Sequence, residues 1–330
     1  MARVADQSAG IFLDFLTAAS VLELDALLVR TLPLEAADSA RPAVFEVTVD
    51  GEPTDRVVST GGTRVRARSA DDIDRSSHDP FISIRFTLGP ATGAERRVQL
   101  WLPHTANVTI LALRSDGTVT AARPETATKW IHYGSSISHS ADADGPLGTW
   151  PTVAARQLGW QLTNMGFGGQ AMLDQFVART IRDLPADVIT LKVGINPLNA
   201  DALRVRTFGP AVHGFLDTIR DGHPETRIVL ISPIACPAHE HIPGPTVLSA
   251  GAQFVGTPDR GDRPGVLTLE LERDILQRLV AQRNDASLLF LDGRSLFAEA
   301  DAAHLYDGLH PDAAGYKLIG DRFAELFSSF

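Results

Sequence analysis

The sequence predicts an α/β protein in which an all-β sandwich of the jelly-roll kind precedes a parallel sheet with helices on both faces. Three observations lead to this prediction. Apolar and polar residues alternate over short runs between residues 41 and 120, strand and helix patterns alternate after residue 126, and a linker at 121–126 separates the two regions. We therefore expect a β-sandwich accessory domain at residues 1–125 and an α/β domain at residues 126–330.

In the first region apolar residues recur at every second position, which is the period of a half-buried strand. Phe45, Val47 and Val49 are apolar, the residues between them are polar, and Asp50-Gly51 then gives a hairpin turn signal. The same alternation recurs over residues 82–88, 98–102 and 108–112. Short strands with this spacing are typical of antiparallel sandwiches and jelly rolls.

The second region alternates strands with helices. Strands are predicted at 129–133, 160–164, 188–193, 227–231 and 288–291, and helical spacing of apolar residues covers 173–184, 212–219 and 267–279. Such alternation favours a parallel sheet whose binding crevice lies at the carboxyl ends of its strands. The stretch 234–265 is rich in Gly and Pro, and two interpretations stay open: a lid or substrate-binding loop, or a disordered surface insertion.

Composition excludes several classes of function. A net charge of −10 and a pI near 5.4 argue against a protein that binds the nucleic-acid backbone. The single cysteine, Cys236, cannot form an intramolecular disulfide or a cysteine-rich zinc site. Neither a signal peptide nor an apolar span of about 20 residues is apparent, so we expect a cytoplasmic protein without a membrane span.

A serine follows the first predicted strand of the second region. Gly134, Ser135 and Ser136 turn the chain where the sheet opens to its crevice, which would expose a hydroxyl close to backbone N–H groups. Taken alone, a Gly-Ser-Ser turn usually has no catalytic role.

Support comes from Asp307 and His310, three residues apart before a helix opened by Pro311. The carboxylate can hold one imidazole nitrogen while the other faces the crevice and accepts a serine proton. One alternative is a helix-capping turn with an exposed histidine. Another is metal ligation, but no further ligands stand at a recognisable spacing, so we expect no metal.

Two more segments end predicted strands at the same edge. The run from Asn164 to Gln170 contains Gly169 and opens a helix, where glycine lets the backbone approach a ligand closely. A phosphate or dinucleotide loop would compete, but its glycine spacing and its lysine are missing, so no cofactor is expected. Asn196 follows the strand at 188–193, and its amide could donate to an oxyanion.

Together these four segments resemble the SGNH, or GDSL-type, hydrolase family over roughly residues 129–330. The resemblance implies a flavodoxin-like three-layer α/β/α domain. It also implies that Ser136 is the nucleophile and that His310 is the base, oriented by Asp307. The backbone N–H groups of Ser136 and Gly169, with the Asn196 amide, would form the oxyanion hole.

Two residues depart from the family pattern. Ser135 replaces the usual aspartate before the serine, and Pro197 replaces the usual aspartate after the asparagine. Neither is the carboxylate that orients the base, so the implied mechanism is unaffected. With the N-terminal sandwich, the chain resembles the branch with an appended jelly-roll domain, which includes carbohydrate esterases and an acyltransferase of aromatic polyketide biosynthesis.

The function expected from the resemblance is that of a serine-dependent carboxylic ester hydrolase, esterase- or lipase-like, acting through an acyl-enzyme. One alternative is an acyltransferase that passes the acyl group to a hydroxyl of a small molecule. A non-enzyme alternative is a carbohydrate-binding protein with a silent hydrolase domain. The expected partners are a small-molecule ester or acyl donor, with a hydroxyl acceptor or a carbohydrate, and no nucleic acid.

Overall fold

The computed structural model describes residues 2–32, 41–67, 73–76, 80–91, 93–122, 126–257 and 263–328. The chain forms two compact units. One comprises Ala2–Thr126 with Asp144–Leu147, and the other comprises Ala127–Ala143 with Gly148–Phe330. Residues 123–125 of the expected linker lie outside the described residues.

The N-terminal unit contains two mainly antiparallel sheets, in the strand orders β10-β1-β8-β3-β4 and β6-β5-β2-β7, with β9 paired to β2 in the second. A short helix, α1 (Ala2–Ala5), precedes the strands. The strands are β1 (Phe12–Thr17), β2 (Val21–Leu32), β3 (Ala43–Val49), β4 (Glu52–Ser59), β5 (Thr63–Ala67), β6 (Ile73–Ser76), β7 (Phe81–Thr87), β8 (Arg96–Trp101), β9 (Ala106–Ser115) and β10 (Val119–Ala121).

Alternation of side chains builds the core of this unit, as the sequence predicts. Phe45, Phe86 and Leu100 are fully buried in one apolar cluster. Asp50 and Gly51 join β3 to β4 with positive φ angles of 51° and 88°, which is the geometry of the predicted hairpin turn. The β-rich fold predicted for this region is confirmed.

Strands β1 and β2 were not predicted, because acidic residues interrupt their apolar pattern. The structure gives these acidic residues arginine partners on neighbouring strands. Asp14 pairs with Arg97 at 2.5 Å, and Asp25 pairs with Arg114 at 2.5 Å. The carboxylates therefore lie on the less buried face of strands whose opposite face, with Phe15 and Leu24, is buried.

The second unit contains a five-stranded parallel sheet in the order β12-β11-β13-β14-β17, a flavodoxin-like arrangement. Its strands are β11 (Lys129–Gly134), β12 (Gln161–Gly166), β13 (Val188–Lys192), β14 (Arg227–Ile231) and β17 (Leu288–Leu291). All five lie where the sequence predicts them, and the predicted α/β fold class is confirmed.

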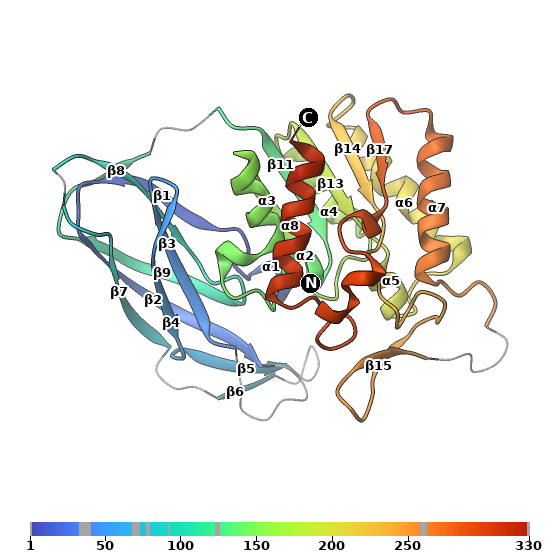
Figure 1. Ribbon diagram of the computed structural model, residues 1–330, viewed down its shortest axis with the longest axis horizontal. Helices are drawn as coiled ribbons and strands as arrows, with labels where there is room; N and C mark the ends of the chain where they lie inside the picture. The colour runs from blue at the N-terminus through green and yellow to red at the C-terminus, as the bar shows by residue number, and fades with distance from the viewer. Residues whose placement is uncertain are drawn as a thin grey trace. The chain divides into compact units, whose positions relative to one another are not determined.

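Helices cover both faces of this sheet (Figure 1). One apolar core contains residues of α4, α6 and α7, and the other contains Trp150 of α3 and Phe323 of α8, which packs face to face on Trp130 at 4.8 Å. The helices are α2 (Ser136–His139), α3 (Trp150–Leu158), α4 (Gln175–Asp183), α5 (Ile195–Asn199), α6 (Val205–Arg220), α7 (Leu269–Arg283) and α8 (Ala313–Phe327), with 3₁₀ turns η2 (Gly293–Ser295) and η3 (Glu299–His304). A further 3₁₀ turn, η1 (Pro146–Gly148), begins in the segment that belongs to the N-terminal unit.

The Gly- and Pro-rich stretch at 234–265 contains regular structure that its sequence pattern did not indicate. Strands β15 (Thr246–Leu248) and β16 (Phe254–Gly256) pair antiparallel. Each strand has only three residues, too few for an alternating pattern to be visible among the flanking turns. Residues 258–262 of the stretch lie outside the described residues.

No helix in the described part of the chain is both long and apolar enough to cross a membrane.

Candidate active site

Ser136 is the first residue of α2, which begins immediately after β11. Ser135 is the N-cap, and its hydroxyl accepts a hydrogen bond from the Ile137 N–H at 3.3 Å. The turn is tight at Gly134, because a side chain there would collide with the Ser138 hydroxyl. The N–H of Ser136 lies in the first turn, where a helix leaves N–H groups without intrahelical acceptors.

Ser136, His310 and Asp307 form one hydrogen-bonded chain. The Ser136 Oγ lies 2.9 Å from His310 Nε2, and His310 Nδ1 lies 2.8 Å from Asp307 Oδ2. The other carboxylate oxygen of Asp307 accepts from the backbone N–H groups of Leu309 and His310, at 3.0 and 2.7 Å. The three side chains predicted to act together are therefore in contact.

The charge of Asp307 suits a group that orients an imidazole. Burial raises the pKa of this carboxyl, but the hydrogen bond from His310 and those from two backbone N–H groups outweigh burial and hold the pKa below its usual value. The carboxylate is thus ionised at neutral pH and accepts from His310 Nδ1–H. This tautomer leaves Nε2 as the acceptor for the serine proton.

Asn196 lies on α5, after β13, and is buried. Its Oδ1 accepts from the Ala171 N–H at 2.9 Å, which fixes the amide plane. Among the described residues, no acceptor is hydrogen-bonded to its Nδ2, so this donor can serve a ligand. The α5 turn begins at Gly194, whose φ of +124° is rarely adopted by other residues.

The glycine segment after β12 lies beside Ser136. A Cβ added to Gly168 would lie 3.9 Å from Ser136 Cβ, and the segment continues to Ala171, which is bonded to Asn196. Gly169 has a left-handed φ of +68°. Its place in this segment is compatible with the expected N–H donor, and this role of Gly169 stays a prediction.

Sequence reasoning did not foresee the buried polar network behind the serine turn. The Nδ1 of His132 lies 2.6 Å from the Thr190 hydroxyl, and its Nε2 lies 2.7 Å from the Ser138 hydroxyl. Burial, with the nearby charge of Lys192, lowers the pKa of His132 to about 3. His132 is therefore neutral and holds Ser138, two residues after the expected nucleophile Ser136.

A buried acid lies against the turn that carries Asn196. Glu272 of α7 is fully buried, and neither carboxyl oxygen has a hydrogen-bond partner among the described residues. A Cβ added to Gly194 would lie 2.5 Å from Glu272 Oε2, so only glycine fits beside this carboxyl. Burial raises the pKa of Glu272 well above its usual value.

We expect Glu272 to make the protein less stable as pH rises. Above about pH 4.3, the usual pKa of Glu, the unfolded chain releases this proton while the folded chain keeps it. This group therefore lowers the free energy of unfolding by about 1.4 kcal/mol per pH unit until the folded carboxyl also ionises. Glu272→Gln has no proton to lose at this position. The free energy of unfolding of this variant, measured in urea, should therefore rise relative to that of the unaltered protein between pH 5 and 7. A difference independent of pH would contradict the expectation.

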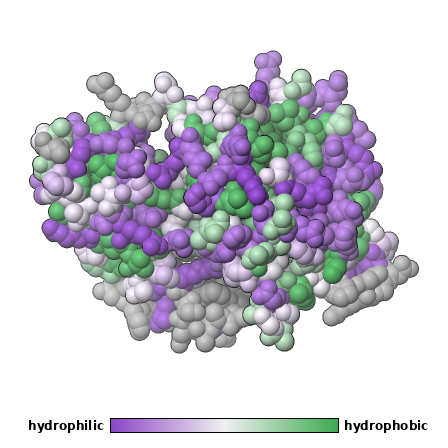
Figure 2. Space-filling view, in the orientation of Figure 1, coloured by the Kyte–Doolittle hydropathy of each residue, from purple (hydrophilic) through white to green (hydrophobic). Residues whose placement is uncertain are grey.

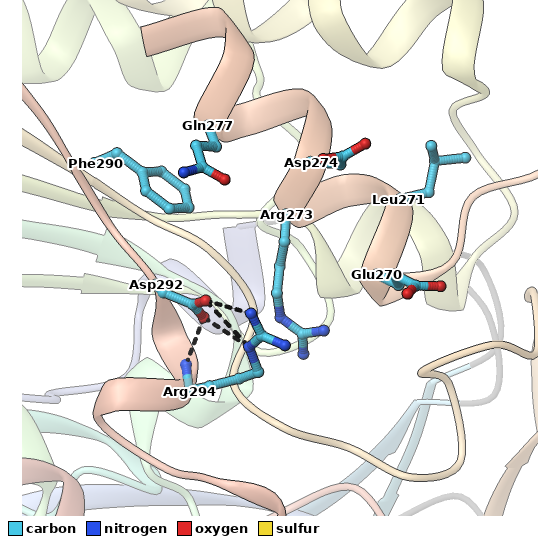
Figure 3. A pocket seen from close by; sticks show the side chains of 8 residues that line it. All are labelled: Glu270, Leu271, Arg273, Asp274, Gln277, Phe290, Asp292 and Arg294. Atoms are coloured by element: carbon cyan, nitrogen blue, oxygen red, sulfur yellow. Dashed lines mark hydrogen bonds and ion pairs between the residues drawn. The ribbon is translucent and has the colours of Figure 1, made fainter. Parts of the chain in front are cut away.

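A surface hollow of about 390 Å³ lies apart from the Ser136 chain (Figure 3). Its lining comes from α7 and from the chain at and after β17, and its arginines already have acidic partners. Arg294 pairs with Asp292 at 2.6 Å, and Arg273 pairs with Glu240 at 2.6 Å.

Among the described residues, no group of three or more His, Cys, Asp or Glu side chains could hold a metal ion.

Comparisons with known proteins show the family and the fold of this chain. A search of curated proteins found no match. Among solved structures, a salicylyl-acyltransferase from a tetracycline biosynthetic pathway is 26% identical in sequence, with a TM-score of 0.76 over 96% of this chain and 81% of that one. A putative GDSL-like lipase from Bacteroides ovatus ATCC 8483 is 18% identical, with a TM-score of 0.71 over 99% of this chain and 86% of that one.

A family two carbohydrate esterase from Clostridium thermocellum, solved with cellohexaose, is 14% identical, with a TM-score of 0.65 over 97% of this chain and 92% of that one. At such low identity the two latter structures establish the fold alone. The GDSL-like lipase/acylhydrolase family matches residues 132–318, more than half of the chain and the part that holds Ser136, Asn196 and His310. The chain therefore belongs to the GDSL-like lipase/acylhydrolase family, the SGNH hydrolases that its sequence resembles.

Proposed function

We propose that this protein is a serine-dependent carboxylic ester hydrolase that acts through an acyl-enzyme. The observation that carries the proposal is the continuous hydrogen-bonded chain from the Ser136 hydroxyl through His310 to the ionised Asp307. A neutral serine hydroxyl is a weak nucleophile, and a histidine base within hydrogen-bonding distance is the usual way to activate it.

Acylation would begin when Ser136 Oγ attacks the ester carbonyl and its proton passes to His310 Nε2. The carbonyl oxygen becomes an oxyanion, which the N–H groups of Ser136 and Gly169 and the Nδ2 of Asn196 would stabilise. The tetrahedral intermediate then breaks its bond to the alcohol oxygen. His310 gives its proton to that oxygen, so the alcohol leaves neutral and the acyl group stays on Ser136.

Deacylation would repeat these steps with water as the nucleophile. His310 takes a proton from the water, hydroxide adds to the acyl carbonyl, and the intermediate releases the acid as Ser136 Oγ regains its proton. Throughout, Asp307 stabilises the imidazolium and keeps its ring in place.

An acyltransferase is the second candidate. It shares every step up to the acyl-enzyme, after which a hydroxyl of an acceptor molecule replaces water. The likeness to the salicylyl-acyltransferase favours this candidate, because it extends over 96% of this chain at 26% identity. Product analysis with and without added alcohols separates the two, since only transfer yields a new ester.

Mass spectrometry of the intact protein after brief incubation with a panel of esters tests the proposed mechanism. We expect a mass increase equal to one acyl group, located on Ser136 by peptide mapping. The size of the adduct identifies the preferred acyl group before any acceptor is known. Neither an adduct nor turnover with any ester, p-nitrophenyl acetate included, would favour a binding protein with a silent hydrolase domain.

Asn196→Ala should lower kcat by about 10²- to 10³-fold, the range for loss of one oxyanion donor. Asn196→Asp is the matched variant, because its carboxylate can still accept from Ala171 N–H but offers no donor at Nδ2. Both variants should bind substrate and keep Ser136 in place while turnover falls. Normal kcat in either variant, measured by initial rates, would remove Asn196 from the oxyanion hole.

A further inference from the structure

The β15–β16 hairpin is bonded to the turn that carries the base. The N–H of Phe254 donates to the carbonyl oxygen of Asp307 at 2.7 Å, and the side-chain amide of Gln253 donates to the carbonyl oxygen of Tyr306 at 3.2 Å. The approach is close, since a Cβ added to Gly308 would lie 3.0 Å from the Phe254 carbonyl oxygen. The hairpin therefore has a fixed position beside His310.

Phe254 also touches the base itself. Its ring centroid lies 5.6 Å from that of His310, and the two ring planes meet edge to face at 78°. Phe254 is half-buried and packs partly against the core shared with α4, α6 and α7. Phe254 is therefore anchored against the core and remains partly exposed.

The other strand of the hairpin is tied to the helix that carries Asn196. The hydroxyl of Thr246 donates to Asn199 Oδ1 at 2.8 Å, and the Nε2 of His239 lies 2.8 Å from the same hydroxyl. The hairpin thus spans the distance between the oxyanion helix α5 and the turn of the base. A substrate held between α5 and the turn of the base would lie along the hairpin.

Both faces of the hairpin carry exposed apolar side chains, and Phe254 shares its face with Leu248. Leu248 is directly opposite Phe254 in the strand register, so both side chains lie on the same face, and Leu248 is 39% exposed. Val247 and Val255 oppose each other on the other face. In Figure 2 hydrophobic and hydrophilic atoms are mixed in the lower part of the view, where β15 lies in Figure 1.

We propose that Phe254, with Leu248, selects esters whose alcohol portion is an apolar ring. This proposal rests on the proposed function. The base gives its proton to the departing alcohol oxygen and takes one from an acceptor hydroxyl, so the group attached to that oxygen must lie next to His310. Phe254 contacts the imidazole edge to face, whereas the carbonyl oxygen would be directed to Asn196. Phe254 lies at the end of the hairpin that is bonded to the turn of the base, so we assign it to the alcohol and not to the acyl chain.

Two substrate series with a shared reference test this assignment. The alcohol ratio is kcat/KM for 2-naphthylmethyl acetate divided by that for ethyl acetate. The acyl ratio is kcat/KM for ethyl 2-naphthylacetate divided by that for ethyl acetate. Phe254→Ala should lower the alcohol ratio by about threefold to tenfold, the equivalent of one aromatic contact, and leave the acyl ratio unchanged.

Further variants separate the contact from effects on folding. Phe254→Leu keeps an apolar side chain but loses the ring, so it should lower the alcohol ratio with little change in thermal unfolding. Leu248→Ser should lower the alcohol ratio less than Phe254→Ala. Val247→Ser, on the opposite face, and Phe176→Ala, an exposed phenylalanine on α4, should leave both ratios unchanged.

The outcomes distinguish this inference from the proposed function. Ester turnover with an alcohol ratio that no hairpin variant changes would overturn the assignment of Phe254 and leave the hydrolase mechanism intact. A change confined to the acyl ratio would do the same, as would a preference of the unaltered protein for acetylated glucose over 2-naphthylmethyl acetate. Absence of any acyl adduct on Ser136 would instead overturn the mechanism, and the inference with it.

Discussion

Ser136→Ala is expected to abolish the acyl adduct and to lower kcat for ester hydrolysis by about 10⁴- to 10⁶-fold. The reason is that the reaction would lose its covalent intermediate, while the oxyanion donors and the base stay in place. The Ser136 hydroxyl is the group that His310 Nε2 contacts, at 2.9 Å, so alanine removes the atom that would accept the acyl group. Intact-protein mass spectrometry with an ester or a fluorophosphonate probe measures the adduct, and initial rates measure kcat.

The adjacent serine provides the matched control. Ser135 is buried, and its hydroxyl accepts from Ile137 N–H as the N-cap of α2. Ser135→Ala should therefore cost about 1 kcal/mol of stability through the lost cap and still form the adduct. An adduct that persists in Ser136→Ala, or one that disappears only in Ser135→Ala, would show that another residue is the nucleophile.

Much of the α/β unit could be predicted because strands such as β14 and β17 are short apolar runs. The bounds predicted for 227–231 and 288–291 coincide with β14 and β17. Parallel strands also end at one edge of a sheet, so residues that follow different strands converge there. This rule brought Ser136 and Asn196 into one hypothesis although no local pattern relates them, and the structure places both after strands of the same sheet.

The pairing of distant charges could not be predicted. Asp14 and Asp25 interrupt an apolar run, and only the fold reveals that Arg97 and Arg114 lie diagonally opposite them on adjacent strands. Strand partners depend on the register between segments far apart in the chain, which a single sequence does not specify. The strands β1 and β2 were missed for this reason.

The contacts around His310 also could not be predicted from the sequence. Phe254 lies in a Gly- and Pro-rich stretch whose three-residue strands leave no periodic signal, and its contact with His310 is tertiary. The bonds of His132 to Thr190 and Ser138 are tertiary as well, although the residue itself stands in a predicted strand. Sequence patterns identified the candidate catalytic groups, whereas the groups that hold them in place became visible only in three dimensions.

Asp307→Asn tests the least obvious member of the candidate triad, and we expect it to lower kcat by about 10⁴-fold. The asparagine amide would donate to His310 Nδ1, so the imidazole proton would move to Nε2. An Nε2–H cannot accept the proton of Ser136, although the side chain would occupy almost the same space. The rate of acyl-adduct formation on Ser136, followed by mass spectrometry, should fall in parallel with kcat.

A second aspartate–histidine pair supplies the control. Asp312 lies 3.2 Å from His304 Nδ1 and caps α8 by accepting from Gly315 N–H at 2.8 Å. Asparagine is an equally good N-cap, so Asp312→Asn should keep both stability and activity. Activity of Asp307→Asn within tenfold of the unaltered protein would show that His310 is oriented without a carboxylate.

The two effects of Asp307→Asn can be separated by pH. The folded pKa of Asp307 is lowered, so the ionised carboxylate contributes stability that is present above the unfolded pKa of about 3.9 and is lost as pH falls through the folded value. The stability difference between Asp307→Asn and the unaltered protein should thus be constant near neutral pH and shrink only below about pH 4. The loss of kcat, in contrast, should persist near neutral pH with the variant fully folded, because it follows from the tautomer of His310 and not from unfolding.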